Sequence, residues 1–410
     1  MAKAVLISVG GSQNPIIYSL KQQKPEYIIF FASVESEKQI PQILQMLKEE
    51  NYSPKKSDQI ITSFAEKFDE CYEIIKKELD SIIKRWGLQP QDIIVDFTGG
   101  TKAMSVALVL ATIDLGCKYS YVGGTERDKE GLGVVIDGKE KILYSVNPWD
   151  ELAVEERKKI SILFNKARYA SAIELLEVVC KKVSQPNFYE IMIDIAKAYD
   201  NWDRFKHSKA KDFLFKGIKR FKDFLAGSQD KKLEELYKKL EENKEFLLRI
   251  VDEKDKKALV CDLIANAERR AKLENKYDDA LARLYRAVEM IAQNRLLEKY
   301  SIKTNDVDLS KVPENLKQKF KERYLDPRDN KIKIGLKASY ELLKEKKDNL
   351  GEKFWNDKRL VELLDIRNNT ILAHGTNSVE KETYEELLGH LLELAEIKIN
   401  DLPQFPTFDL

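Results

Sequence analysis

Arg367 and His374, near the C-terminal end of the chain, combine residue types and a spacing that could do chemistry. They lie seven positions apart in a segment with helical periodicity, expected to form a helix over Lys358–His374. Seven residues are almost two turns, so both side chains would project from one face, about 10 Å apart along the axis. The chain has only three histidines. A titratable imidazole aligned with a fixed cation could cleave a phosphodiester without a metal ion.

This expected helix would carry the pair on an apolar seam rather than on its solvated face. Asn356 or Asp357 can cap its start. Its apolar stripe is made of Leu360, Leu364, Arg367, Ile371 and His374. An arginine is rarely buried without a partner. The seam should therefore meet another helix, a second subunit or an anionic substrate.

A purely structural interpretation competes with the catalytic one. Arg367 could pair with a nearby carboxylate, while His374 satisfies carbonyl groups at the helix end. The carboxylates that could serve are Asp365, Glu362 and Glu289.

A second group of polar residues follows the short apolar run Ile93–Phe97. It is the turn Thr98-Gly99-Gly100-Thr101-Lys102, which leads into a helical pattern. Glycines let the backbone approach a ligand, and a helix N-terminus offers free N–H groups. The hydroxyls and the Lys102 charge suit phosphate, although the turn lacks the Walker A spacing. Alternatively, it is only a tight strand-to-helix turn.

Further polar turns should lie at the same edge of one sheet, because each follows an expected parallel strand. The candidate ligand-binding residues in these turns are Gly10, Gly11, Ser12, Gln13, Asn14, Ser33 and Gly123.

The elements that must hold these turns alternate between strand and helix over residues 1–150. Such alternation indicates a mainly parallel sheet covered on both faces. The expected strands are Ala4–Val9, Tyr27–Phe31, Gln59–Thr62, Ile93–Phe97 and Lys118–Val122. The expected helices are Gln42–Glu49, Phe64–Arg85 and Lys102–Leu115. Gly131–Val146, with Asp137-Gly138, is expected to form a closing β-hairpin.

After Pro148 the pattern is helical. We expect a connector over residues 151–256 and an all-α domain over 257–410. The Lys- and Glu-rich residues 230–250 indicate a solvated helix, and Ser301–Asp329 a looser segment. The other expected helical segments are Ile160–Phe164, Tyr169–Val179, Leu263–Leu273, Asp278–Glu298 and Lys381–Ile397.

Composition narrows the class of protein. The net charge is +1, with 18 Lys and Arg against 21 Asp and Glu in residues 1–150 and 52 against 48 in the rest. Neither part is basic enough for a tight duplex binder. The four separated cysteines predict buried free thiols in a reducing compartment, and few histidines make a Cys/His zinc site improbable. No apolar run reaches membrane-spanning length, and the first one reads as a strand rather than a signal peptide. A cytoplasmic protein is expected.

The run Asp96–Met104 resembles the CARF domain, a Rossmann-like sensor of CRISPR-associated proteins. This resemblance implies that the polar edge of the sheet binds cyclic oligoadenylate across a two-fold axis. A symmetric ring suits a symmetric dimer. Cyclic tetra-adenylate is favoured over hexa-adenylate as the activator, and no cofactor or metal is expected.

Arg367-Asn368 followed by Ala373-His374-Gly375 resembles the R-x4-6-H signature of HEPN ribonucleases, and Asp278–Glu289 resembles an early helix of that fold. The resemblance implies a homodimer with a composite cleft. It also implies metal-independent scission of RNA by the adjacent 2′-hydroxyl. His374 would transfer a proton or orient the 2′-hydroxyl, Arg367 would stabilise the phosphorane, and Asn368 would position the phosphate or the catalytic pair.

Together the two ends resemble the CARF–HEPN ancillary ribonucleases of type III CRISPR systems, which cleave single-stranded RNA in antiviral defence. Three alternatives stay open. The chain could be a non-catalytic sensor whose helical end binds a partner protein, or a ligand-independent toxin-like HEPN ribonuclease. The sheet edge could also cleave its own ligand slowly, with Thr98, Thr101 or Ser12 orienting a ribose hydroxyl. His207 could grip RNA but is expected to be structural, and His390 is expected in packing or at the surface.

Overall fold

A computed structural model describes residues 3–124, 140–145, 148–227, 230–368, 370 and 377–409. These residues form two compact units. The first is Met1–Lys158 with Leu175–Glu190, and the second is Lys159–Glu174 with Ile191–Leu410. Helices α5 (Pro148–Asn165), α6 (Tyr169–Cys180) and α7 (Asn187–Asp203) contribute to both. The predicted domain boundaries at residues 150 and 256 stay predictions.

The first unit is built on a six-stranded sheet of order β3-β2-β1-β4-β5-β6. Strands β1 to β5 run parallel, and β6 pairs antiparallel with β5. The strands are β1 (Ala4–Ser8), β2 (Tyr27–Ser33), β3 (Lys56–Thr62), β4 (Ile93–Asp96), β5 (Lys118–Gly124) and β6 (Glu140–Ser145). The five predicted parallel strands are thus confirmed. The predicted hairpin turn at Asp137-Gly138 lies outside the described residues.

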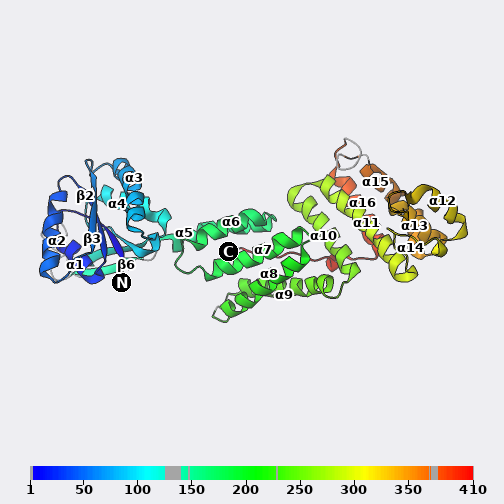
Figure 1. Cartoon of the computed structure of the whole chain (residues 1–410), viewed down its shortest axis with the longest axis horizontal. Coiled ribbons are helices and arrows are strands. Elements are labelled where there is room, and N and C mark those ends of the chain that lie inside the picture. The colour runs from blue at the N-terminus through cyan, green and yellow to red at the C-terminus, as the bar shows by residue number, and fades with distance from the viewer. Residues whose placement is uncertain are drawn as a thin grey trace. The chain divides into compact units, whose positions relative to one another are not determined.

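Helices cover both faces of this sheet (Figure 1). Helices α1 (Asn14–Gln23) and α2 (Ile40–Glu49) pack on one face, and α3 (Phe68–Trp86) and α4 (Lys102–Thr112) pack on the other. All five residues of β1 are therefore buried, which explains its continuous apolar sequence.

Helix α1 was not predicted from the sequence. Residues Gly10 to Asn14 were expected to form one turn, but Asn14 is the first residue of the helix and Pro15 follows it in the first turn. Ser19 and Gln23 face inward and are buried. Polar residues on the buried face disguise the amphipathic pattern, so periodicity did not reveal the helix.

The second unit is helical, with one two-stranded β-ribbon. Its helices, beyond the parts of α5, α6 and α7, are α8 (His207–Leu225), α9 (Lys231–Val251), α10 (Lys256–Glu274), α11 (Tyr277–Tyr300), α12 (Glu314–Tyr324), α13 (Leu336–Glu345), α14 (Asn349–Asn356), α15 (Lys358–Asn368) and α16 (Lys381–Ala395). The ribbon pairs β7 (Leu325–Asp326) with β8 (Lys331–Ile332).

Three predictions need correction here. Helix α12 lies inside the segment expected to be loose. Helix α9 is solvated on one side only, because Leu240 and Leu247 are fully buried. The helix predicted over Lys358–His374 ends at Asn368. The predicted buried free thiols are confirmed for Cys71, Cys117 and Cys261, whereas Cys180 is only half-buried. Within the described ranges, no helix is long and apolar enough to cross a membrane.

Candidate functional site

The turns after β1 and β4 meet where the strand order of the sheet reverses, which is the usual ligand-binding position in such sheets. They touch backbone to backbone. A Cβ on Gly10 would collide with the amide of Gly100, and a Cβ on Gly99 would collide with the carbonyl of Ser8. Ser8 Oγ also donates to the Gly99 carbonyl at 2.6 Å. The glycines are required because no side chain fits between the two turns.

Asp96, at the end of β4, holds this pair of turns in place. Its carboxylate is fully buried and accepts hydrogen bonds from Ser19 Oγ at 2.6 Å, Ser120 Oγ at 2.7 Å and the Thr98 amide at 3.0 Å. It thereby joins α1, β5 and the Thr-Gly-Gly-Thr-Lys turn. Sequence reasoning missed this role, although an aspartate ending a buried apolar strand was a usable signal, since a buried carboxylate requires donors.

The hydroxyl groups at this edge divide into structural and available ones. Thr101 caps α4: its Oγ1 accepts from the Met104 amide at 3.2 Å and donates to the Ala65 carbonyl. Its single hydroxyl hydrogen is therefore engaged. Thr98 Oγ1 accepts from the Val122 amide at 2.8 Å, which leaves its hydrogen for a ligand. Ser33 is bound by Ser36 in a turn, with 3.1 Å between their hydroxyls.

The remaining predicted ligand residues lie around the same edge. Gly11 and Ser12 are exposed in the turn before α1, and Gln13 donates to Gln42 at 2.8 Å. Gly123 lies inside β5 rather than after it, opposite Lys141 of β6.

Lys102, the first residue of α4, is exposed. Among the residues that the structure describes it forms no ion pair. The edge therefore offers one cation, the N-terminal amides of α4 and a free threonine hydroxyl, which is chemistry suited to an anionic ligand.

Arg367 lies in the last turn of α15, above the ring of Tyr285 of α11, with 4.6 Å from its Cζ to the ring centroid. The carboxylates considered as its partners bind other cations. Their pairs are Asp365 with Lys337, Glu362 with Arg359 and Glu289 with Arg286. Among the described residues, Arg367 forms no ion pair with any of these three carboxylates.

The helix predicted to join Arg367 to His374 is interrupted. Thr370 donates both its amide and its hydroxyl to the Arg367 carbonyl, at 3.1 and 2.9 Å, and forms a bridge with Asn377. Asn and Thr favour such local bonds over helix continuation. The predicted helix is therefore not continuous through Thr370. The Asn368 side chain, Ile371 and His374 lie outside what the structure describes, whereas Asp357 caps α15 as predicted.

Two family models match the helical part of the chain. The Csm6 6H domain matches residues 152–247, and the Csm6 HEPN domain matches residues 249–398. Together they match more than half of the chain. The chain belongs to the Csm6 family. The resemblance to CARF–HEPN ribonucleases is confirmed, and the chain is an endoribonuclease of the HEPN type.

Solved structures agree with the family in fold. Csm6 from Enterococcus italicus, bound to cyclic hexa-2′-fluoro-hexa-dAMP, aligns with a TM-score of 0.61 at 13% identity, over 98% of this chain and 96% of that chain. Can2 from Sulfobacillus thermosulfidooxidans, in complex with cyclic tetra-adenylate, aligns with a TM-score of 0.25 at 16% identity, over 30% of this chain and 31% of that chain. The last similarity is too low to support an argument. No protein of curated function matches the chain.

The two histidines that the structure describes have structural partners. His207 lies 2.8 Å from the buried carboxylate of Asp262, which also accepts from Trp202 Nε1 at 2.8 Å. This contact joins the 6H domain to α10 of the HEPN domain. His390 lies 2.8 Å from Asp357, the cap of α15. Neither imidazole is left to act on RNA.

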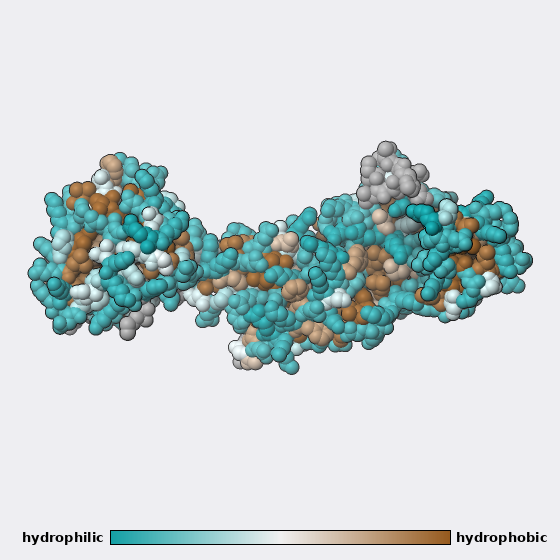
Figure 2. All heavy atoms as spheres, in the orientation of Figure 1, coloured by the Kyte–Doolittle hydropathy of each residue, from teal (hydrophilic) through white to brown (hydrophobic). Residues whose placement is uncertain are grey.

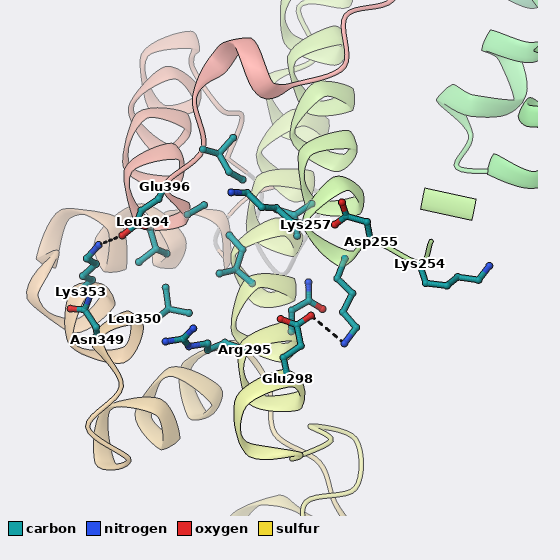
Figure 3. A pocket seen from close by; sticks show the side chains of 16 residues that line it. Lys254, Asp255, Lys257, Arg295, Glu298, Asn349, Leu350, Lys353, Leu394 and Glu396 are labelled. Carbon is teal, nitrogen blue, oxygen red and sulfur yellow. Dashed lines mark hydrogen bonds and ion pairs between the residues drawn. The ribbon is translucent and has the colours of Figure 1, made fainter. Parts of the chain in front are cut away.

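The HEPN domain also contains a cavity of about 670 Å³ between α10, α11, α14 and α16 (Figure 3). Leu350 and Leu394 form part of its wall. Its acidic residues are all paired: Glu298 with Lys256 at 3.4 Å, Glu396 with Lys353, and Asp255 with Arg249 at 2.7 Å. No lining residue belongs to α15, so this cavity is separate from the Arg367 site.

Proposed function

We propose that this Csm6 protein is a metal-independent endoribonuclease of CRISPR antiviral defence, which cyclic oligoadenylate activates and which cleaves single-stranded RNA. One observation carries the proposal. Within the region matched by the HEPN model, Arg367 sits on an aromatic ring with no carboxylate to neutralise it in the described part of the chain. An arginine held in this way retains its charge for a phosphate.

In the proposed reaction the 2′-hydroxyl attacks the adjacent phosphorus and the 5′-oxygen leaves. The products are a 2′,3′-cyclic phosphate and a 5′-hydroxyl. His374 takes the 2′-proton, orients the 2′-hydroxyl or returns a proton to the leaving oxygen. Arg367 stabilises the extra negative charge on the phosphorane, and Asn368 positions the phosphate.

The activator binds at the edge formed by the turns after β1 and β4. Support comes from Lys102, the Thr98 hydroxyl and the backbone amides after Gly99, which together suit phosphate. The structure of the related Csm6 of Enterococcus italicus contains a cyclic ligand of six nucleotides. Our expectation from the sequence is the tetra-adenylate ring. Both rings are therefore tested.

A homodimer completes both sites. Exposed apolar residues adjoin each of them: Ile366, 39% exposed, precedes Arg367, and Val106 and Leu110 lie one turn apart on α4, beyond Lys102. Apolar patches interrupt the largely hydrophilic surface in Figure 2. A second copy would cover such faces, and its two-fold axis suits a symmetric ring.

The test is cleavage of a labelled single-stranded RNA in EDTA, with and without cyclic tetra-adenylate or hexa-adenylate. We expect one ring to stimulate cleavage strongly and the products to end in a cyclic phosphate. Arg367→Ala with His374→Ala should abolish cleavage, whereas Arg359→Ala, on the exposed side of the same helix, should not. Full activity of the double variant would overturn the catalytic assignment. Equal rates without either ring would favour the ligand-independent ribonuclease.

Ring cleavage by the sheet edge remains a weaker proposal. The Thr101 hydroxyl is committed to Ala65, so Thr98 and Ser12 are the residues left for it. Recovery of the intact ring after long incubation would rule it out.

A further inference from the structure

Arg367 has an unusual environment for a half-buried arginine. Its Nε is buried and has no hydrogen-bond acceptor among the described residues. A buried N–H without an acceptor costs free energy. In most proteins a carboxylate would fill this place, yet the three candidate partners Asp365, Glu362 and Glu289 bind other cations. Lys337 holds Asp365 at 2.6 and 2.9 Å.

Among the described residues, the guanidinium contacts the ring of Tyr285, with 4.6 Å from Cζ to the ring centroid. Helix α11 places this ring one turn before Glu289, and its neighbours Leu284 and Val288 are fully buried in the HEPN core. The ring is therefore carried by a rigid element. Burial, and then Glu289, raise the pKa of the Tyr285 phenol, against a smaller opposite effect of Arg367. The phenol is thus neutral near pH 7.

A neutral aromatic face and a carboxylate hold an arginine in different ways. The ring attracts the cation through its quadrupole and uses none of the N–H donors. A carboxylate would bind two of those donors and cancel the charge. On Tyr285 the guanidinium is fixed in direction but keeps its charge and its donors, including a buried Nε–H that a phosphate oxygen could satisfy.

We infer that Tyr285 is a positioning residue of the nuclease, which seats Arg367 by its ring so that the guanidinium meets the scissile phosphate of RNA. This inference rests on the proposed ribonuclease function. The hydroxyl of Tyr285 has no role in seating. The ring lowers the freedom of Arg367 before RNA binds, and its contribution should appear in kcat, where the phosphorane charge develops.

The test replaces the ring while keeping its shape. Tyr285→Phe should retain activated cleavage, because the ring face remains. Phenylalanine with one, two and then three ring fluorines at position 285 should lower kcat stepwise, by about 3- to 30-fold in all, because fluorine weakens the quadrupole at constant volume. KM should change much less. Tyr285→Leu should lower kcat at least as far. Tyr277→Leu, which removes another ring of α11, in tilted contact with the Tyr384 ring, serves as the matched control.

The outcomes distinguish failure of the Tyr285 positioning role from failure of the proposed ribonuclease function. If Arg367→Ala keeps full activity, the proposed catalytic role fails. If Arg367→Ala leaves only a small residual kcat but the fluorinated series leaves kcat unchanged, the seating role alone fails. In the Arg367→Ala background, removal of the Tyr285 ring should cause no further loss. An additional loss there would show that Tyr285 acts independently of Arg367. The fluorinated series keeps the test open even if Tyr285→Leu does not fold.

Discussion

Ser19 of helix α1 donates a 2.6 Å hydrogen bond to the buried carboxylate of Asp96 at the end of β4. The same oxygen of Asp96 accepts from Ser120 of β5, and the other accepts from the amide of Thr98 in the ligand turn. One carboxylate therefore fixes the turn relative to a helix and a neighbouring strand. The position of the turn depends on a group that does not itself face the ligand.

We expect Asp96→Asn to weaken both stability and response to the activator. The amide presents N–H donors where three donors already converge, so at least one is left without an acceptor. The loss should be about 1–3 kcal/mol in the free energy of unfolding. Urea unfolding measures the stability, and the concentration of cyclic oligoadenylate that gives half-maximal cleavage measures the response to the activator. Asp80→Asn, on the exposed side of α3, should change neither. An unchanged activation curve for Asp96→Asn would contradict this role.

The two glycine-containing turns at the sheet edge should tolerate an added methyl group unequally. In Gly99→Ala the new Cβ meets the Ser8 carbonyl, whereas in Gly11→Ala it meets nothing within 4 Å. Overpacking of this kind costs about 1–3 kcal/mol. Gly99→Ala should lower the unfolding temperature and raise the concentration of cyclic oligoadenylate needed for half-maximal cleavage. Gly11→Ala should leave the unfolding temperature unchanged. Equal behaviour of the two variants would refute the close approach of the turns.

Asn266 of α10 should couple the helical connector, residues 151–256, to helix α11, which carries Tyr285. Its amide nitrogen donates to Asp203 of α7 at 2.9 Å, and its oxygen accepts from Arg283 of α11, two residues before Tyr285. Asn266→Ala removes both contacts. We expect the variant still to bind cyclic oligoadenylate, while the RNA cleavage that this ligand stimulates falls several-fold. Calorimetric binding and RNA cleavage on the same preparation check this, with Asn315→Ala, whose exposed side chain binds Glu345, as the control. Unchanged stimulation would exclude this route.

Asp348 should make the stability of the HEPN domain depend on acidic pH. Burial raises its pKa, but Lys299, Arg295 and further donors outweigh burial and hold the pKa at about 2, against 3.8 ordinarily. A depressed pKa stabilises the fold above pH 3.8, and that contribution is lost as the pH falls toward 2. It amounts to about 2 kcal/mol.

Asp348→Asn should therefore lose stability at pH 7 and show a flatter decline between pH 5 and pH 2. Urea unfolding across that range measures it. Asp306→Asn, an exposed partner of Lys331, should follow the wild type. A parallel decline in Asp348→Asn would show that the charge of Asp348 does not stabilise the fold.

Periodicity was a good guide where one physical effect dominated. Strands β1, β2 and β4 were predicted because they are largely buried on both faces and therefore almost continuously apolar, as Ala4–Ser8 shows. The edge strand β3 gave a weaker signal, because only its last residues are buried. The Thr-Gly-Gly-Thr-Lys turn was identified because glycine, hydroxyl and lysine residues at a strand-to-helix junction have few other uses. Helix α1 was missed because its buried face carries polar residues: Ser19 donates to Asp96, and Gln23 donates to the hydroxyls of Ser19 and Ser120.

The candidate nuclease site also combines features that the sequence predicted with one that it did not. The residue types Arg367, Asn368 and His374 and the resemblance to HEPN ribonucleases were available from the sequence. The end of α15 at Asn368 was not, because it depends on Thr370 binding the Arg367 carbonyl and on its bridge to Asn377. Local propensity alone does not decide whether such a helix continues.

The sequence by itself thus determined the family, the alternation of strands and helices and the chemical types at both sites, since these depend on composition and local spacing. Only the tertiary structure decided which groups meet. It paired Asp365 with Lys337 rather than Arg367, placed Tyr285 beneath Arg367 from 82 positions away, and engaged the Thr101 hydroxyl with Ala65. These contacts join segments far apart in the chain, and their geometry is set by the packing of whole elements rather than by local spacing.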